Sequence, residues 1–84
     1  MDEYGIVFGK ALHAKLKEKI KAGILVKVNS DDEVVVEIIR DRQVDYTYII
    51  DNFSIKFLHG YSTDIAAYEI VSAYRKCILN RYFA

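Results

Sequence analysis

The sequence predicts a single α+β domain over residues 1–84, in which helices pack on one face of a three-stranded antiparallel sheet. Three observations support this fold class. Apolar residues recur every four positions in the first quarter of the chain, as they do in an amphipathic helix. Three short segments rich in β-branched residues follow, with polar turns between them. The last quarter is again helical in pattern, so the predicted order is α–β–β–β–α–α.

The first predicted element is a helix over residues 5–22. Its apolar positions form one stripe, which consists of Phe8, Leu12, Leu16 and Ile20. We expect Gly23 just past the end of this helix, because glycine is the residue that most often follows a helix C-terminus.

Residues 24–29, 33–40 and 44–50 are the predicted strands. The second is apolar at both alternating sets of positions, which is typical of the central strand of a small sheet. Polar turns at 29–33 (NSDDE) and 40–43 (RDRQ) connect the strands. Because these connections are short, we expect an antiparallel meander.

The third strand alternates between apolar and polar residues. Its expected core face consists of Val44, Tyr46, Tyr48 and Ile50. Asp45 and Thr47 are expected to face outward.

Two more helices are predicted after the sheet. The first is short, over residues 53–59 (FSIKFLH), and ends at Gly60. The second runs over residues 63–82, with Ser62 as its N-cap and Asp64 in its first turn, where the helix dipole favours an acid.

The last helix has more apolar surface than one contact with the sheet requires. A broad arc contains Ala66, Ala67, Ile70, Val71, Ala73, Tyr74, Cys77 and Ile78. A core-facing stripe needs about half of such an arc. A second group lies on the other side of the helix and consists of Ile65, Tyr68, Leu79 and Phe83, beside Arg75 and Lys76. Either the preceding short helix or the N-terminal helix covers this group, or it is a self-complementary dimer face.

The chain end also carries two aromatic residues, Tyr82 and Phe83. Chain ends are commonly frayed and polar. We therefore expect these two side chains to pack into the core or into an interface.

Composition excludes several functional classes. Twelve basic and twelve acidic residues give zero net charge, which does not indicate a globally basic nucleic-acid binder. No apolar run approaches the roughly 20 residues of a membrane helix, and the first residues (MDEYGIVFGK) lack the pattern of a secretory signal. The single cysteine fits a reducing compartment, so we expect a cytoplasmic protein.

No pattern indicates catalysis, a cofactor or a metal. His13, His59 and Cys77 lack the spacing of metal ligands, and Cys77 lies in the apolar arc of the last helix, as an inert packed thiol does. The acids at 31–33 are interpreted as a turn, although they could attract a divalent cation. Glu37 and Asp45 could lie across neighbouring strands as a carboxylate pair.

A lysine-rich side of the first helix is the feature that would suit nucleic acid. Lys10, Lys17 and Lys21 lie there together with His13. Lysines give non-specific, salt-sensitive attraction to phosphates, whereas base reading uses arginine, asparagine or glutamine, which this helix lacks. A solvated lysine face is the favoured explanation of the pattern.

The second half of the chain contains a tyrosine-rich strand, then residues 55–62 (IKFLHGYS), residues 74–79 (YRKCIL) and a final RYF at 81–83. In these features it resembles short uncharacterised proteins of phages and integrated mobile elements of Gram-positive bacteria, over roughly residues 34–83. The resemblance implies a cytoplasmic accessory protein that binds host or phage machinery, and it implies no functional residue.

The expected function is therefore that of a small non-enzymatic interaction protein, homodimeric and directed at another protein. Its expected interface residues are Tyr68, Arg75, Leu79 and Phe83, since aromatic residues and arginine are common interface anchors. The alternative is a nucleic-acid-associated protein that uses Lys10, Lys17 and Lys21.

Overall fold

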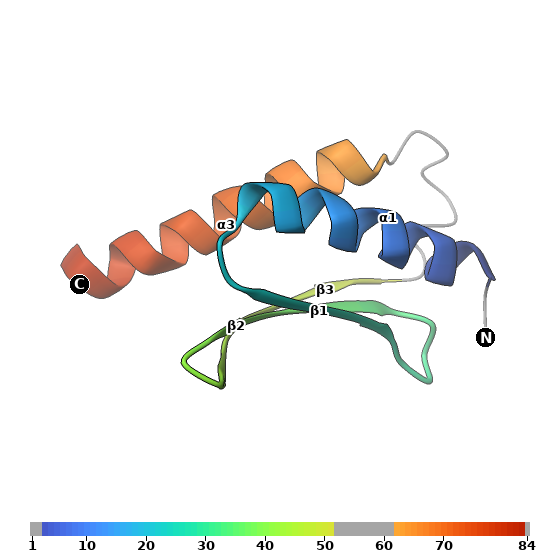
Figure 1. The fold of residues 1–84 in the computed structure, drawn as a ribbon, viewed down its shortest axis with the longest axis horizontal. Coiled ribbons are helices and arrows are strands. Elements are labelled where there is room, and N and C mark those ends of the chain that lie inside the picture. Colours follow the sequence, from blue (N-terminus) through green and yellow to red (C-terminus); the bar gives the residue numbers. More distant parts are fainter. Residues whose placement is uncertain (1–2, 52–61, 84) are drawn as a thin grey trace.

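The computed structural model describes residues 3–51 and 62–83. Its elements are α1 (Glu3–Lys19), β1 (Gly23–Val28), β2 (Val34–Arg40), β3 (Gln43–Ile50) and α3 (Thr63–Phe83). Figure 1 shows that both helices cover the same face of the sheet. The predicted α+β class is confirmed, and the predicted short helix over 53–59 lies outside the described residues.

The sheet is an antiparallel meander in the order β1-β2-β3, as predicted. β2 is the central strand, and its apolar side chains are buried on both faces. Val34, Val36 and Ile38 on its helix-facing side are fully buried, and Val35 on its other side is only 8% exposed. In this register Val36 lies between Val26 of β1 and Tyr48 of β3.

The core lies between the sheet and the two helices. The predicted stripe of α1 is confirmed, because Phe8, Leu12, Leu16 and Ile20 are all buried. α3 contributes its own buried set, which consists of Ala66, Ala67, Ile70, Val71 and Tyr74. These alanines let the two helices lie close together on a sheet of only three strands.

The end of α1 differs from the prediction. The helix ends at Lys19, although the Ile20 amide still donates to the Leu16 carbonyl at 2.9 Å. Gly23 is the first residue of β1, and its φ is not positive. It therefore does not cap the helix. A Cβ at this position would lie 3.3 Å from Cβ of Ile39 on β2, so close strand contact explains the glycine.

A β-bulge changes the faces of β3. Ile38 pairs with Tyr46, but the next residue, Ile39, pairs with Val44, so Asp45 is an extra residue on β3. Val44 therefore lies on the outer face of the sheet, 52% exposed, and Asp45 turns toward α3. The predicted faces of these two residues are wrong, because strict alternation of side chains assumes strand pairing without a bulge. The prediction for Tyr46, Tyr48 and Ile50 is confirmed, since all three face the core.

Both predicted turns are present. At the first, the Asn29 side chain accepts hydrogen bonds from the amides of Asp31 and Glu33 at 2.9 and 3.0 Å. At the second, Asp41 and Arg42 have φ of 54° and 66°. Two consecutive residues with positive φ are typical of the two-residue turn that matches the twist of paired strands.

α3 begins as predicted, because the Ser62 hydroxyl accepts a hydrogen bond from the Ile65 amide at 3.2 Å. Asp64 in the first turn forms an ion pair with Lys15 of α1 at 3.0 Å. The far end of α3 extends beyond α1 and beyond the sheet (Figure 1). Tyr82 and Phe83 are 80% and 84% exposed there, so they do not pack into the core, and their packing into an interface stays a prediction.

Candidate interaction surfaces

The outer face of α3 carries large apolar side chains that the domain does not bury. Tyr68 and Leu79 are 72% and 54% exposed. They belong to a row that follows the helix at alternating spacings of three and four residues, and we call this row the α3 stripe: Ile65, Tyr68, Ser72, Arg75, Leu79 and Tyr82. Such spacing keeps side chains on one line of a helix, as at the contact line of a coiled coil.

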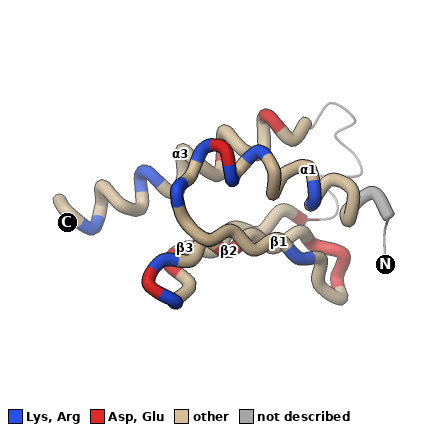
Figure 2. The backbone as a smooth tube through the Cα atoms, viewed as in Figure 1, with Lys and Arg blue, Asp and Glu red and all other residues tan. Residues whose placement is uncertain are grey.

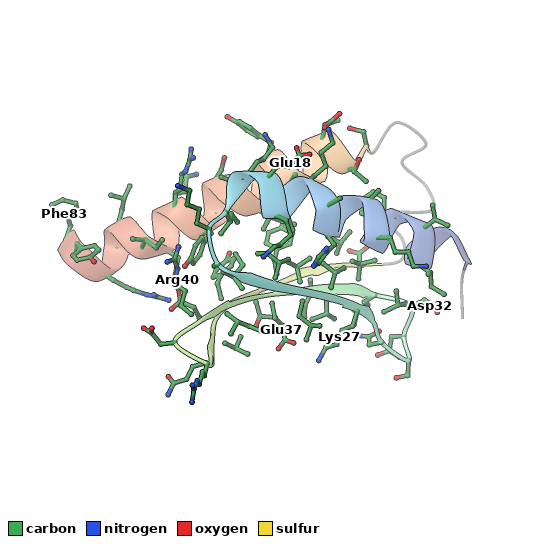
Figure 3. The ribbon with its side chains drawn as sticks, in the orientation of Figure 1. Glu18, Lys27, Asp32, Glu37, Arg40 and Phe83 are labelled. Carbon is green, nitrogen blue, oxygen red and sulfur yellow. The ribbon has the colours of Figure 1, made fainter. Side chains whose placement is uncertain are left out.

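All four predicted interface residues lie on this exposed side. Tyr68, Arg75 and Leu79 are members of the α3 stripe, and Phe83 lies next to its end and points away from the domain (Figure 3). α1 does not cover them, so the explanation that the first helix buries the second apolar group is wrong. The row remains a surface available to another molecule.

A polar cluster on the opposite side fastens the projecting part of α3 to the sheet. The Tyr74 hydroxyl donates to one carboxylate oxygen of Asp45 at 2.6 Å, and Nη1 of Arg81 donates to the other at 2.7 Å. Nη2 of Arg81 also donates to the Asp45 carbonyl at 2.9 Å. Nε of Arg40 donates to the Tyr74 hydroxyl oxygen, and its guanidinium carbon lies 5.6 Å from the centre of that ring.

This cluster is an effect of the bulge. Without the extra residue in β3, Asp45 would point to the outer face and the two α3 side chains would lack their acceptor. The sequence does place Tyr74 and Arg81 seven residues apart, hence on one side of α3. It gives no sign that Asp45 meets them, and the cluster was not predicted.

The cluster shifts the acidities of its members. The hydrogen bond from Tyr74, and then that from Arg81, lowers the pKa of the Asp45 carboxyl below its ordinary value. Burial, and then the hydrogen bond to Asp45, raises the pKa of the Tyr74 phenol. Both shifts favour the native pairing of a charged carboxylate with a neutral phenol. Tyr74 and Arg81 already donate to both oxygens of the Asp45 carboxylate, so the cluster serves to hold α3 on the sheet.

Stability should therefore depend on the charge of Asp45. Its native pKa lies below the ordinary value of about 3.9, so its contribution is present above that pH and is lost as the pH falls through the native pKa. We expect Asp45→Asn to lower the free energy of unfolding at neutral pH and to flatten its decline below about pH 4. Urea titrations followed by circular dichroism from pH 6 to pH 2 would measure both effects.

Asp31→Asn is the matched control, because it removes the same charge from an exposed turn. We expect it to leave the acid limb of the stability curve close to that of the wild type. Equal acid limbs for the wild type and Asp45→Asn would show that the fastening does not depend on the carboxylate.

A groove lies between α1 and β1. Its volume is about 520 Å³, and it is lined by Ile6, Gly9, Lys10, His13, Val26, Lys27 and Val28. α1 sits close to β1 here, since a Cβ on Gly9 would lie 3.3 Å from a methyl of Val26. His13 donates through Nε2 to the Ile24 carbonyl at 3.1 Å, and Lys17 donates to the Ala22 carbonyl at 3.2 Å.

The predicted nucleic-acid residues are divided by this arrangement. Lys10 lines the groove, and Lys17 reaches the chain segment that leads into β1. Lys21 lies beyond the end of α1, in that connecting segment. The lysines of α1 thus lie along the edge of the sheet. The acids of the turn between β1 and β2 lie at the end of β1 that is far from Lys17 and Lys21 (Figure 2).

The face of the sheet away from the helices is a third exposed area. Leu25, Val44 and Ile49 are 46%, 52% and 55% exposed on it. Lys27 and Glu37, which point away from the helices in Figure 3, form an ion pair across this face at 3.3 Å. The apolar side chains on this face are therefore interrupted by a charged pair.

The carboxylates proposed as a pair are not together. Glu37 pairs with Thr47 in the register and lies on the outer face, whereas Asp45 faces α3. Cys77 is a free, half-buried thiol. Within residues 3–51 and 62–83 the structure groups no three potential metal ligands, and none of the helices in that part of the chain could span a membrane.

Comparison of the chain with protein-family models, with curated proteins and with solved structures found no match.

Proposed function

We propose that this chain is a small non-enzymatic interaction protein that forms a homodimer through the α3 stripe. The observation that carries the proposal is four large apolar or aromatic side chains, 46% to 80% exposed, on a helix whose first apolar side is already buried in the core: Ile65, Tyr68, Leu79 and Tyr82. Contiguous exposed apolar surface in a small soluble domain marks a site of association. Four members of the row are apolar or aromatic, and Arg75 adds a common interface anchor.

The spacing of the stripe favours antiparallel pairing of two α3 helices. With a two-fold axis near residues 73 and 74, each member faces another member: Ile65 faces the second copy's Tyr82, and Tyr68 faces its Leu79. At the centre Ser72 faces Arg75. A two-fold contact must use the same surface on both copies, and this row satisfies that condition along its whole length.

Charge supports the same orientation. Glu69 and Lys76 lie one position beyond Tyr68 and Arg75, so both flank the stripe on the same side. Antiparallel pairing brings the Glu69 of each copy toward the Lys76 of the other. Parallel pairing would place Arg75 beside Arg75, and like charges in contact oppose association. In its own chain Glu69 also lies near Tyr48, whose pKa rises through burial and then through this carboxylate.

The test is the oligomeric state of a stripe variant. In the antiparallel dimer, residue 68 of one copy faces residue 79 of the other, so Tyr68→Glu with Leu79→Glu places two acids face to face. We expect this double variant to be a folded monomer, with a dissociation constant of the dimer raised by at least about a hundredfold. Sedimentation equilibrium across a range of concentrations would measure it. Asn80→Glu is the matched control, since it adds an acid beside Leu79 but outside the stripe, and we expect it to dimerise like the wild type.

Two outcomes would contradict the proposal. One is a wild-type protein that stays monomeric at the highest concentration tested. The other is a double variant that sediments as the wild type does, which would move any self-association to another face. Circular dichroism of the double variant checks that it remains folded.

The proposed biological setting rests on the sequence. The resemblance to short phage and mobile-element proteins supports an accessory role that acts on another protein, and the lone cysteine supports a cytoplasmic location.

A further inference from the structure

The edge of β1 has the features of a site for an extended peptide. β1 is an outer strand of the sheet formed by the described residues. The Ile24 carbonyl accepts its hydrogen bond from His13, so it points away from β2. Since backbone groups of alternate residues in a strand point the same way, the N–H and C=O groups of Val26 and Val28 also point away from β2.

These backbone groups face the groove beneath α1. Val26 and Val28 line the groove, together with Ile6 and Gly9 of the helix. An edge strand with outward donors and acceptors can pair with an added strand, and pockets beside it select the side chains of that strand. A helix directly above the edge gives such pockets an apolar wall. The bond from His13 closes the Ile24 end, so about four backbone groups remain for pairing.

Charge indicates which peptide would fit. Lys10 lies in the groove wall, His13 lies at its closed end, and Lys17 lies one helical turn further on. The acids near the groove lie at the opposite end of β1, in the turn that contains Asp31, Asp32 and Glu33, and Lys27 is already paired with Glu37. A bound segment would therefore place its acidic residues toward Lys10 and its apolar residues against Ile6 and Val28.

We propose that the groove between α1 and β1 binds an extended acidic segment of a partner protein by adding it as a fourth strand at the edge of β1. The inference rests on the proposed function only in taking the target to be a protein. The groove and the α3 stripe lie on different elements, so the Tyr68→Glu, Leu79→Glu variant should bind the peptide as the wild type does. Loss of dimerisation and loss of peptide binding are thus separate results.

The test uses a fluorescein-labelled peptide of alternating glutamate and valine, eight residues long, with fluorescence anisotropy as the readout. We expect Lys10→Glu to weaken its binding about tenfold, because a like charge would then face the peptide. Lys19→Glu is the matched control, since Lys19 is an exposed lysine at the end of the same helix that does not line the groove. We expect it to change the affinity less than about twofold.

Two N-methylated versions of this peptide, one methylated along each edge, test strand addition itself. N-methylation at alternate residues removes the backbone donors on one edge and keeps every charge, so methylation on the pairing edge should abolish binding. In the unmodified complex, the amide resonances of Val26 and Val28 should shift and their hydrogen exchange should slow. These readouts do not depend on a variant that has to fold.

Four results would overturn the proposal. These are no binding of the glutamate–valine peptide, equal losses with Lys10→Glu and Lys19→Glu, unchanged binding of both N-methylated peptides, or displacement of the peptide by single-stranded DNA that binds more tightly. The last result would assign the basic side of α1 to nucleic acid. A lysine–valine peptide that binds equally well would remove the charge argument.

Discussion

Leu12→Ala is expected to lower the free energy of unfolding by about 3 kcal/mol. Leu12 is completely buried in the middle of α1, where its stripe meets the sheet. The substitution removes three carbon atoms and leaves a cavity, which the surrounding side chains cannot close fully. A domain of this size is only marginally stable, so a loss of this size removes a large share of its free energy of unfolding. Urea titration followed by circular dichroism would measure the change.

Val7→Ala is the matched control for this prediction. Val7 lies on the same helix but is 66% exposed, so it contributes little to the core. Alanine also has the higher helix propensity, and we expect a change of less than about 0.5 kcal/mol, in either direction. Similar losses for the two variants would mean that α1 does not pack on the sheet through the stripe that contains Leu12.

Cysteine cross-linking is expected to distinguish antiparallel from parallel α3 helices in the proposed dimer, because only the antiparallel arrangement brings the two chosen cysteines together. In a Cys77→Ala background, one protein carries Ser72→Cys and a second carries Arg75→Cys. Antiparallel pairing places residue 72 of one copy opposite residue 75 of the other, within the short Cα separation that a disulfide requires. Mixing the two proteins under mild oxidation should therefore give a mixed disulfide as the main product, seen on a non-reducing gel and by mass spectrometry.

Each cysteine protein oxidised alone is the control. In the antiparallel arrangement two copies of residue 72 are displaced by about 4.5 Å along the helix axis, so Ser72→Cys alone should cross-link slowly. Rapid cross-linking of Ser72→Cys with itself would instead indicate parallel helices and would contradict the proposed pairing. Using two separate proteins also removes the disulfide that neighbouring cysteines in one helix could form within a single chain.

The two surfaces proposed here have different energetic character. The α3 stripe is apolar at both ends, so most of its association should be insensitive to salt, and only the contribution of Arg75, Glu69 and Lys76 should weaken as salt screens it. The groove beside β1 combines backbone hydrogen bonds with lysine charges, so binding there should weaken as salt screens the charges. A protein that pairs through α3 would present two such grooves, and a target with two acidic segments would gain from binding both of them.

Local patterns in the chain predict the order of the described elements and most of the core. The repeat of Phe8, Leu12 and Leu16 defined the buried side of α1, and the apolar residues on both faces of residues 34–39 identified the central strand. The same local pattern showed that α3 has two apolar sides, and hence where an interface could lie. These features depend on contacts between residues three or four apart in a helix, or two apart in a strand, and such spacing is visible in the chain itself.

The register of the sheet, and the side chains that meet because of it, depend on how distant segments pack together. The bulge at Asp45 turned that carboxylate toward Tyr74 and Arg81, which lie 29 and 36 residues further along the chain. The groove likewise needs α1 to lie over the edge of β1, with His13 on the Ile24 carbonyl. A bulge inserts one residue and reverses every face beyond it, and its position depends on how distant segments pair and pack, which local periodicity does not encode.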